Sequence, residues 1–524
     1  MCFTRWLALS SLLVTCWSKD LSFPVDFTFG VGTSAYQIEG AWNVSDKTEH
    51  IWDRFVHQHP DRIYNGNNGD VACDSYHQWR RDIAMVKELG ATFYRFSISW
   101  PRILPTGFTN HISEDGVLYY NNLINGLLKE GIQPVVTIYH WDLPQRLQDL
   151  GGWTNPLITD WFASYARVLF SRFGDRVKTW HTINEPYTVC DMGYVIFAPG
   201  INDPQVGRYL CSKYILIAHA KAWRVYDEEF RAMYNGKISI VNHIIWFEPK
   251  NQNDSVLAEL AMQEFTGRYS HPIFSKEGGW PPVLETLIAE KSRYEGYDIS
   301  RLPAFTKDEV ELVKGTFDFY GVNHYTSRLV RKRPSKDAPS SYILDSLSEL
   351  GVSFEASKDW KSTSSSWFME YPEGFRRTLQ WLRNQYGDID FVITENGYAT
   401  ASQSLEDYDR INYMRTYMEQ MLLAIKEDGI KVLSYTTWSL MDNFEWLDGY
   451  RSTFGLYQVD FSDPNRRRTP KLSAKYYASV VKARSLDISN QSMYSISASA
   501  DSNISKRMQM YLLLVFHFLT RRQV

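Results

Sequence analysis

The stretch FVITENG, residues 391–397, contains the pattern that decides the fold. An apolar, β-branched run is followed at once by Glu395, Asn396 and Gly397. A short run of this kind, bounded by a turn signal, is typical of a buried strand that ends in a loop. Similar β-branched or aromatic runs occur at residues 27–33, 92–97, 134–139, 179–184, 237–242, 319–323, 390–394 and 432–438.

Longer stretches with helical periodicity lie between these runs. They include residues 76–89, 119–130, 161–173, 372–386 and 407–428. Eight strands alternating with helices predict an α/β protein, a single (β/α)8 TIM barrel with long βα loops. A doubly wound open sheet is the competing arrangement. Such a sheet usually has a Gly-rich phosphate turn, but Gly30 and Gly32 are followed by no third glycine in register.

Polar and aromatic residues close most of the predicted strands. In a barrel the carboxyl ends of the strands meet on one face, where functional residues gather. Packing explains such residues poorly, so we expect a site on this face. In chain order they are Gln37, Glu39, Arg95, His140, Trp141, Asn184, Glu185, Asn323, Tyr325, Glu395, Asn396, Trp438, Glu445 and Trp446.

Two of these residues, Glu185 and Glu395, are carboxylates that each stand beside an asparagine at a strand end. They follow the fourth and seventh predicted strands, which lie nearly opposite in an eight-stranded ring. A lone Glu in a loop is usually solvated, whereas a facing pair can cleave a glycosidic bond by double displacement. That reaction requires the two carboxyl groups to lie about 5–5.5 Å apart.

Longer motifs resemble the signatures of glycoside hydrolase family 1, the retaining β-glucosidases. Residues 391–397 resemble the nucleophile signature of that family, and residues 182–186 (TINEP) resemble its acid/base motif. The resemblance extends from about Phe23 to Lys482. The other matching segments are 27–40, like the N-terminal signature; 438–446, like the glucose-binding segment; and 468–471 with Tyr476 and Tyr477, like the C-terminal motif.

The resemblance implies that Glu395 is the nucleophile and that Glu185 is first the acid and then the base. Arg95 and Tyr325 match the family residues that support the nucleophile. Glu185 has to hold a proton near neutral pH, and we expect repulsion from the charge on Glu395 to favour this. Asn184 would hydrogen-bond the 2-hydroxyl of the sugar.

The remaining matches describe a pocket for one hexose. A buried His or Trp is more often part of the core than a ligand-binding residue, but the family match favours binding here. Glu445 should repel a 6-phosphate. The implied substrate-binding residues are Gln37, His140, Trp141, Asn184, Asn323, Tyr325, Trp438, Glu445 and Trp446.

The leaving-group side varies across the family, and the match there suggests Thr188, Phe197, Trp367 and Met369. Glu185 favours ordinary O-glycosides, because plant thioglucosidases of the family usually have Gln at that position. Two alternatives stay open: a thioglucosidase acting on glucosinolates, and a catalytically silent, klotho-like binding protein. We expect no cofactor and no metal. His181 and His324 depart from the common residues of the motifs.

Composition limits the classes of partner that the protein can bind. The 524 residues carry a net charge of -4 and no dense basic tract, which argues against nucleic acid as a partner. We expect a small β-glycoside or oligosaccharide substrate, no transmembrane span and, as an open alternative, a homodimer. The aromatic content of 15% fits a large core or a carbohydrate site.

The ends of the chain differ from its middle. Residues 1–18 resemble a secretory signal peptide, 19–486 would form the glycosidase domain, and 487–524 form a Ser-rich tail with a short apolar C-terminus. We therefore expect a secreted protein, with a lipid-anchored surface form as the alternative. Asn43, Asn253, Asn490 and Asn503 begin glycosylation triplets.

The cysteines do not form a dense disulfide framework. Removal of the signal would leave Cys73, Cys190 and Cys211. Three thiols cannot all pair. Cys190 and Cys211 lie in one loop-rich stretch, so the sequence allows a bridge between them, which would leave Cys73 free.

Overall fold

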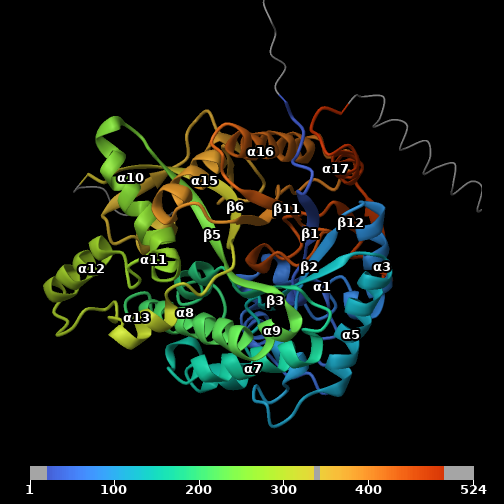
Figure 1. The fold of residues 1–524 in the computed structure, drawn as a ribbon, viewed down its shortest axis with the longest axis horizontal. Coiled ribbons are helices and arrows are strands. Elements are labelled where there is room, and N and C mark those ends of the chain that lie inside the picture. The colour runs from blue at the N-terminus through green and yellow to red at the C-terminus, as the bar shows by residue number, and fades with distance from the viewer. Residues whose placement is uncertain (1–19, 335–342, 489–524) are drawn as a thin grey trace, which may run out of the picture.

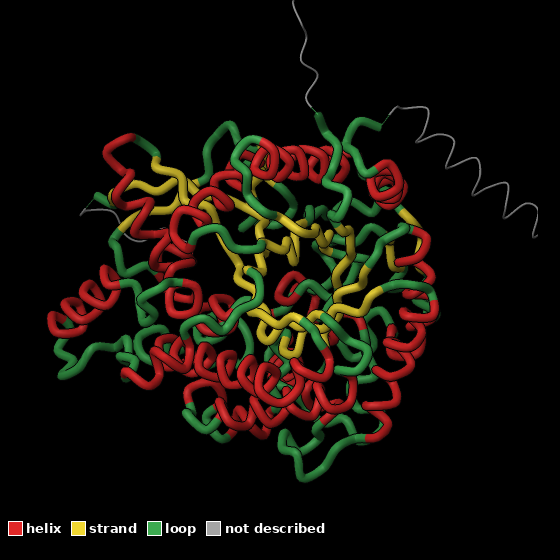
Figure 2. Tube along the Cα trace, in the orientation of Figure 1, coloured by secondary structure: helices red, strands yellow, loops and turns green. Residues whose placement is uncertain are grey.

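Eight parallel strands close into a ring in the computed structural model, which describes residues 20–334 and 343–488. The ring closes because β10 pairs with both β6 and β11, and β11 pairs with β1. Figure 2 shows the strands at the centre and the helices around them. The strands are β1 (Thr28–Gly32), β2 (Phe93–Ser97), β3 (Gln133–Tyr139), β4 (Thr179–Asn184), β5 (Lys237–Pro249), β6 (Tyr320–Lys332), β10 (Phe391–Asn396) and β11 (Val432–Trp438).

Helices cover the outside of the ring, as Figure 1 shows for α7, α8 and α16. The predicted (β/α)8 barrel is therefore confirmed. The α-helices are α1 (Ala35–Ile38), α2 (Ile51–Gln58), α3 (Ser75–Glu88), α4 (Trp100–Ile103), α5 (Glu114–Lys129), α6 (Gln145–Asp149), α7 (Ile158–Phe173), α8 (Gly207–Val225), α9 (Arg231–Tyr234), α10 (Ser255–Met262), α11 (Arg268–Phe274), α12 (Pro282–Tyr294), α13 (Lys307–Val313), α14 (Ile343–Leu347), α15 (Pro372–Tyr386), α16 (Tyr408–Lys426) and α17 (Leu472–Ala483).

Two barrel strands are longer than the sequence predicts. We expected the fifth strand to end at residue 242 and the sixth at 323, but β5 and β6 continue to Pro249 and Lys332. Beyond the ring they stay paired with each other, and β7 (Val352–Glu355) joins β6 in antiparallel register. The polar residues at 242 and 323 end the apolar run without ending the backbone pairing. This ribbon rises on the side of the barrel that carries the site.

Short elements complete the loops. Two small antiparallel sheets form from β8 (Lys361–Ser362) with β9 (Met369–Glu370) and from β12 (Tyr457–Val459) with β13 (Arg468–Pro470). The short helical turns are η1 (Pro60–Arg62), η2 (Tyr64–Gly66), η3 (Gly152–Thr154), η4 (Thr188–Met192), η5 (Tyr226–Phe230), η6 (Gln252–Asp254), η7 (Gln263–Gly267) and η8 (Trp446–Asp448). Of these, η4, η5 and η7 are π-helical.

Much of the aromatic content lies in the core. Trp52, Trp100, Trp153 and Trp180 are each at most 2% exposed. Trp100 stacks on Tyr165 with ring centroids 4.5 Å apart, the kind of contact that large rings make between a barrel and its helices. The high aromatic content is therefore explained by the core, and it does not by itself indicate a ligand-binding site.

The proposed signal peptide and most of the Ser-rich tail, together with Asn490 and Asn503, lie outside the described residues. Among the helices that the structure describes, none is both long and apolar enough to cross a bilayer.

Gly397 provides a test of how tightly the barrel closes beside β10. A Cβ atom there would lie 1.8 Å from the Trp438 carbonyl oxygen, closer than any real contact. We expect Gly397→Ala to lower the free energy of unfolding by about 1–3 kcal/mol, because the β10 and β11 ends would have to separate. Urea denaturation followed by tryptophan fluorescence measures this, and an unchanged midpoint would show that the approach is not tight.

Candidate active site

Both predicted carboxylates lie at the carboxyl ends of barrel strands. Glu395 is in β10, with Asn323 of β6 as its register partner, and Glu185 directly follows β4. Glu185 has a positive φ of 52°, which turns its side chain out of the strand path. Glu395 is only 4% exposed and Glu185 only 6% exposed. The barrel thus buries both acids on the face where we expected a site.

The surroundings of Glu395 stabilise a negative charge. Arg95 Nη1 donates to Glu395 Oε1 at 2.5 Å, and the Tyr325 hydroxyl donates to Oε2 at 2.7 Å. The same Arg95 nitrogen donates to the Thr394 carbonyl oxygen at 3.0 Å, which holds the guanidinium against the strand end. A buried carboxylate with a cation and a hydroxyl donor is suited to act as an ionised nucleophile.

Glu185 has neutral hydrogen-bond partners. Asn323 Nδ2 donates to its Oε1 at 2.7 Å, and the Thr188 hydroxyl donates to its Oε2 at 2.8 Å. His243 Nδ1 lies 4.0 Å from that second oxygen. A buried carboxyl group whose direct donors are neutral keeps its proton more readily than one that is ion-paired.

One hydrogen-bond network joins the two acids. Asn184 Oδ1 accepts from Arg95 Nη2 at 2.7 Å and from Asn323 Nδ2 at 3.1 Å. Arg95 in turn contacts Glu395, and Asn323 contacts Glu185. Residues from four different strand ends therefore meet around one space.

Burial is the main cause of the pKa shifts. It raises the pKa of Glu185 above its usual range, against the lowering effects of Asn323, Thr188 and Arg95. Burial also raises the pKa of Glu395, where the charge of Arg95 opposes it and repulsion from Glu185 adds to it. Our expectation that repulsion keeps Glu185 protonated is therefore corrected, since desolvation does most of that work. Because only Glu395 touches a cation, it is the acid that carries the charge.

The residues expected to bind the sugar surround the same space. Gln37 Nε2 lies 3.4 Å from Glu445 Oε2, and Trp141 Nε1 donates to the Asn184 carbonyl oxygen at 2.9 Å. Asn184 Nδ2 lies 3.2 Å from His140 Nε2. The His140 ring stacks on Trp438 with ring centroids 5.8 Å apart, and the rings of Trp141 and Trp446 have centroids 4.3 Å apart.

The pKa of Glu445, the residue expected to repel a 6-phosphate, is shifted by its surroundings. Burial raises its pKa well above the usual range, and Asp448, Glu395 and Glu185 add repulsion. A neutral carboxyl group can donate as well as accept a hydrogen bond. The repulsion of a 6-phosphate expected from the sequence therefore applies only once Glu445 has lost its proton.

The four residues assigned to the leaving-group side do not behave alike. Phe197 packs against Trp141 at 6.1 Å, and Trp367 packs edge-on against Tyr325 at 5.9 Å. The backbone NH of Met369 is bonded to Thr326 Oγ1 on β6. Thr188 has a different place: its hydroxyl contacts Glu185 itself, as described above.

Sequence reasoning missed His243. This residue follows the fifth predicted strand, the one strand for which no polar end was noted, and it packs against Tyr325 and Trp367 at 6.2 and 6.5 Å. A search for polar residues at the end of every strand would have found it. His181 Nδ1 accepts from Arg95 Nε at 3.1 Å, whereas His324 lies against Phe375.

Cysteines and metal-type clusters complete the inventory. Cys190 and Cys211 form a disulfide, and Cys73 is a free, buried thiol whose pKa burial raises. Within residues 20–334 and 343–488, no group of three or more His, Cys, Asp or Glu side chains could hold a metal ion.

Comparison with known proteins decides the family. The model of glycosyl hydrolase family 1 matches residues 19–486. The chain belongs to glycosyl hydrolase family 1. It is 48% identical over 471 residues to Myrosinase 1 of Brevicoryne brassicae, covering 88% of this chain and 99% of that protein. It is 41% identical to the cytosolic beta-glucosidase of Cavia porcellus, covering 89% and 99%.

A solved structure supports the same assignment. An aphid myrosinase superimposes with a TM-score of 0.84 at 48% identity, covering 88% of this chain and 99% of the other. The family resemblance read from the motifs is thus confirmed, and this family 1 protein is an enzyme, a β-glycosidase.

Arg95 provides a test of the charge on Glu395. We expect Arg95→Met to lower kcat/KM by about 10²–10³, because the Glu395 charge loses its cation. The pKa of Glu395 should rise further, since Arg95 lowers it. Activity is lost as the pH falls through that pKa, so the acidic limb of kcat/KM should move to higher pH.

Arg468→Met is the matched control, because Arg468 is a buried arginine paired with Asp82 at 3.2 Å. Its acidic limb should stay in place. An unmoved limb in Arg95→Met would show that Arg95 does not set the ionisation of Glu395.

Proposed function

We propose that the protein is a secreted, retaining β-glucosidase that hydrolyses terminal, non-reducing β-D-glucosyl residues of O-glycosides, with galactosides and fucosides as further candidate substrates. One observation carries the proposal: two buried carboxyl groups share a hydrogen-bond network, one on a cation and the other on neutral donors. That asymmetry supports a nucleophile and an acid in one site.

In the first step, Glu395 attacks the anomeric carbon and forms a glycosyl ester. Glu185 gives its proton to the departing glycosidic oxygen. Arg95 and Tyr325 hold both oxygens of Glu395, which fixes the attacking group in place.

In the second step, water replaces the leaving group. Glu395 is now an uncharged ester, and Glu185, which gave its proton to the leaving group, is a carboxylate. As a carboxylate it takes a proton from water, and the hydroxide oxygen attacks the anomeric carbon while the ester bond breaks. The β-configuration is retained because two inversions follow one another.

A second candidate function is thioglucoside hydrolysis. It is favoured by the 48% identity to a protein named Myrosinase 1. Glu185 supports O-glycosides, because an alkoxide leaving group needs a proton. A silent binding protein has less support, since both carboxyl groups have their hydrogen-bond partners.

Substitution of the two acids tests the mechanism. We expect Glu395→Gln to abolish hydrolysis of an aryl β-glucoside. Glu185→Ala should lower turnover by about 10²–10⁴, because general acid–base catalysis is lost, and added azide should restore it as a β-glucosyl azide. Failure of azide to rescue turnover would remove Glu185 from the acid/base role. Comparing an aryl glucoside, cellobiose, laminaribiose and a glucosinolate ranks the two functions.

Secretion has its own test. Asn43 and Asn253 are exposed and begin acceptor triplets, which supports passage through a secretory pathway. We expect the full chain, expressed in insect cells, to appear in the medium and to lose mass on treatment with peptide N-glycosidase F. The double variant Asn43→Gln, Asn253→Gln should lose the shift that these two sites contribute. Retention of the protein inside the cells would contradict secretion.

A further inference from the structure

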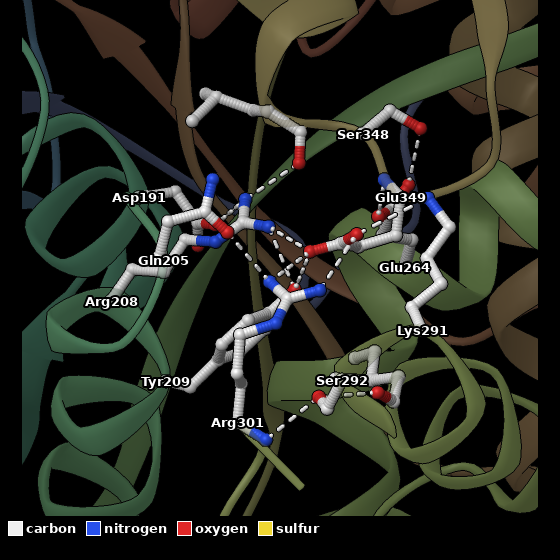
Figure 3. Close-up of polar contacts among 12 residues, drawn as sticks. Asp191, Gln205, Arg208, Tyr209, Glu264, Lys291, Ser292, Arg301, Ser348 and Glu349 are labelled. Carbon is white, nitrogen blue, oxygen red and sulfur yellow. Dashed lines mark hydrogen bonds and ion pairs between the residues drawn. The ribbon is translucent and has the colours of Figure 1, made fainter. Parts of the chain in front are cut away.

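A buried cluster of charged side chains lies behind the acid/base residue. We call it the clamp cluster and define it as Asp191, Arg208, Arg268, Arg301 and Glu349. All five are at most 7% exposed. Figure 3 shows Arg208 between Asp191 and Glu349, with Arg301 reaching the same glutamate. Buried charges are costly unless they are paired, so this many in one place needs a reason.

Asp191 binds two of the arginines of the cluster and a tyrosine. Arg268 Nη2 lies 2.6 and 2.7 Å from its two carboxylate oxygens, and Arg208 Nη1 lies 3.4 Å from Oδ1. The Tyr269 hydroxyl donates to Oδ2 at 2.6 Å. These donors come from α8 and α11, two separate helices outside the ring.

Asp191 belongs to the segment that touches the general acid. It lies in η4 (Thr188–Met192), a single π-helical turn, three residues after Thr188. The Thr188 hydroxyl donates to Glu185 Oε2, and the Val189 NH donates to the Glu185 carbonyl oxygen at 3.0 Å. The chain of contacts therefore runs from the clamp cluster through one helical turn to the acid/base carboxyl group.

Glu349, the second carboxylate of the cluster, is also held by several hydrogen bonds. Arg208 Nη2 and Arg301 Nη1 each donate to Glu349 Oε1 at 2.8 Å, and the Glu349 NH donates to Glu264 Oε1 at 2.6 Å. Burial alone would raise the pKa of Glu349, but hydrogen bonds from Arg301 and the charge of Arg208 lower it to about 2. The carboxylate thus stays charged and keeps Arg208 in place.

We propose that Asp191 is a positioning residue for general-acid catalysis: by binding Arg208 and Arg268 it fixes η4, and η4 holds the Thr188 hydroxyl on Glu185. The Cys190–Cys211 disulfide also joins the same turn to α8. Asp191 acts through Thr188 and Glu185, and the inference rests on the proposed glycosidase function.

A merely stabilising ion pair would behave differently. Loss of stability reduces the amount of folded enzyme and affects every substrate alike. Loss of acid positioning affects only substrates whose leaving group needs a proton. Phenyl β-D-glucoside has such a leaving group, whereas 2,4-dinitrophenolate departs without one. The ratio of kcat/KM for the two glucosides therefore reports the acid alone.

The test measures kcat/KM for both glucosides with the full-length enzyme. Asp191→Asn should lower the value for phenyl glucoside at least about tenfold and that for dinitrophenyl glucoside by less than about twofold. Thr188→Val, which removes the last contact of the chain, should change the ratio in the same direction. Equal losses on both substrates, or no loss on either, would overturn the proposal.

Asp82→Asn is the matched control, because Asp82 is also a buried aspartate paired with an arginine, at 3.2 Å from Arg468. Its ratio should stay at the wild-type value even if the protein is less stable. If Asp191→Asn does not fold, Tyr269→Phe removes one donor from Asp191, and an unchanged ratio there would also overturn the proposal. A wild type inactive on both glucosides would instead refute the proposed function together with this inference, whereas an active wild type isolates Asp191.

Discussion

The contact between Arg95 and Glu395 is the interaction on which the site depends. Inside a barrel, a carboxylate is stable only if charge and hydrogen bonds replace the water it has lost. Arg95 is completely buried, and its donors reach Glu395, Thr394 and Asn184. One guanidinium therefore favours the charged form of Glu395 and holds Asn184, the residue next to Glu185, in place. Glu185 differs from Glu395 because its direct hydrogen-bond donors, Asn323 and Thr188, are neutral.

The barrel brings together the residues around the two carboxyl groups, although they are far apart in the chain. Parallel strands bring their carboxyl ends to one face, so β2, β4, β6 and β10 each add a group to a single network. The loops then support the groups from outside. The clamp cluster, on η4, α8, α11 and the loops that carry Arg301 and Glu349, is connected to Glu185 through Thr188, so the two carboxyl groups have different sets of supporting partners.

Prediction from sequence succeeded where local pattern and long motifs agree. The strand at residues 179–184 and the helix at 372–386 have the predicted bounds, because an apolar period and its end signals define each. Prediction from sequence failed where strand pairing or tertiary contacts determine the structure. The extension of β5 and β6 depends on two distant strands meeting, and the hydrogen bond from the Thr188 hydroxyl to Glu185 depends on how the chain folds after β4.

The sequence by itself determined the barrel and the family, because strand periodicity and long motifs are local properties of the chain. It also singled out Glu185 and Glu395 as the candidate pair of acids. Only the tertiary structure decided the direction in which the pKa values of Glu185, Glu395 and Glu445 shift, because a pKa depends on the desolvation and neighbours that folding supplies. The same holds for Asp191, an ordinary acidic residue in the sequence. Its role depends on Arg208 and Arg268, which folding brings from two other helices.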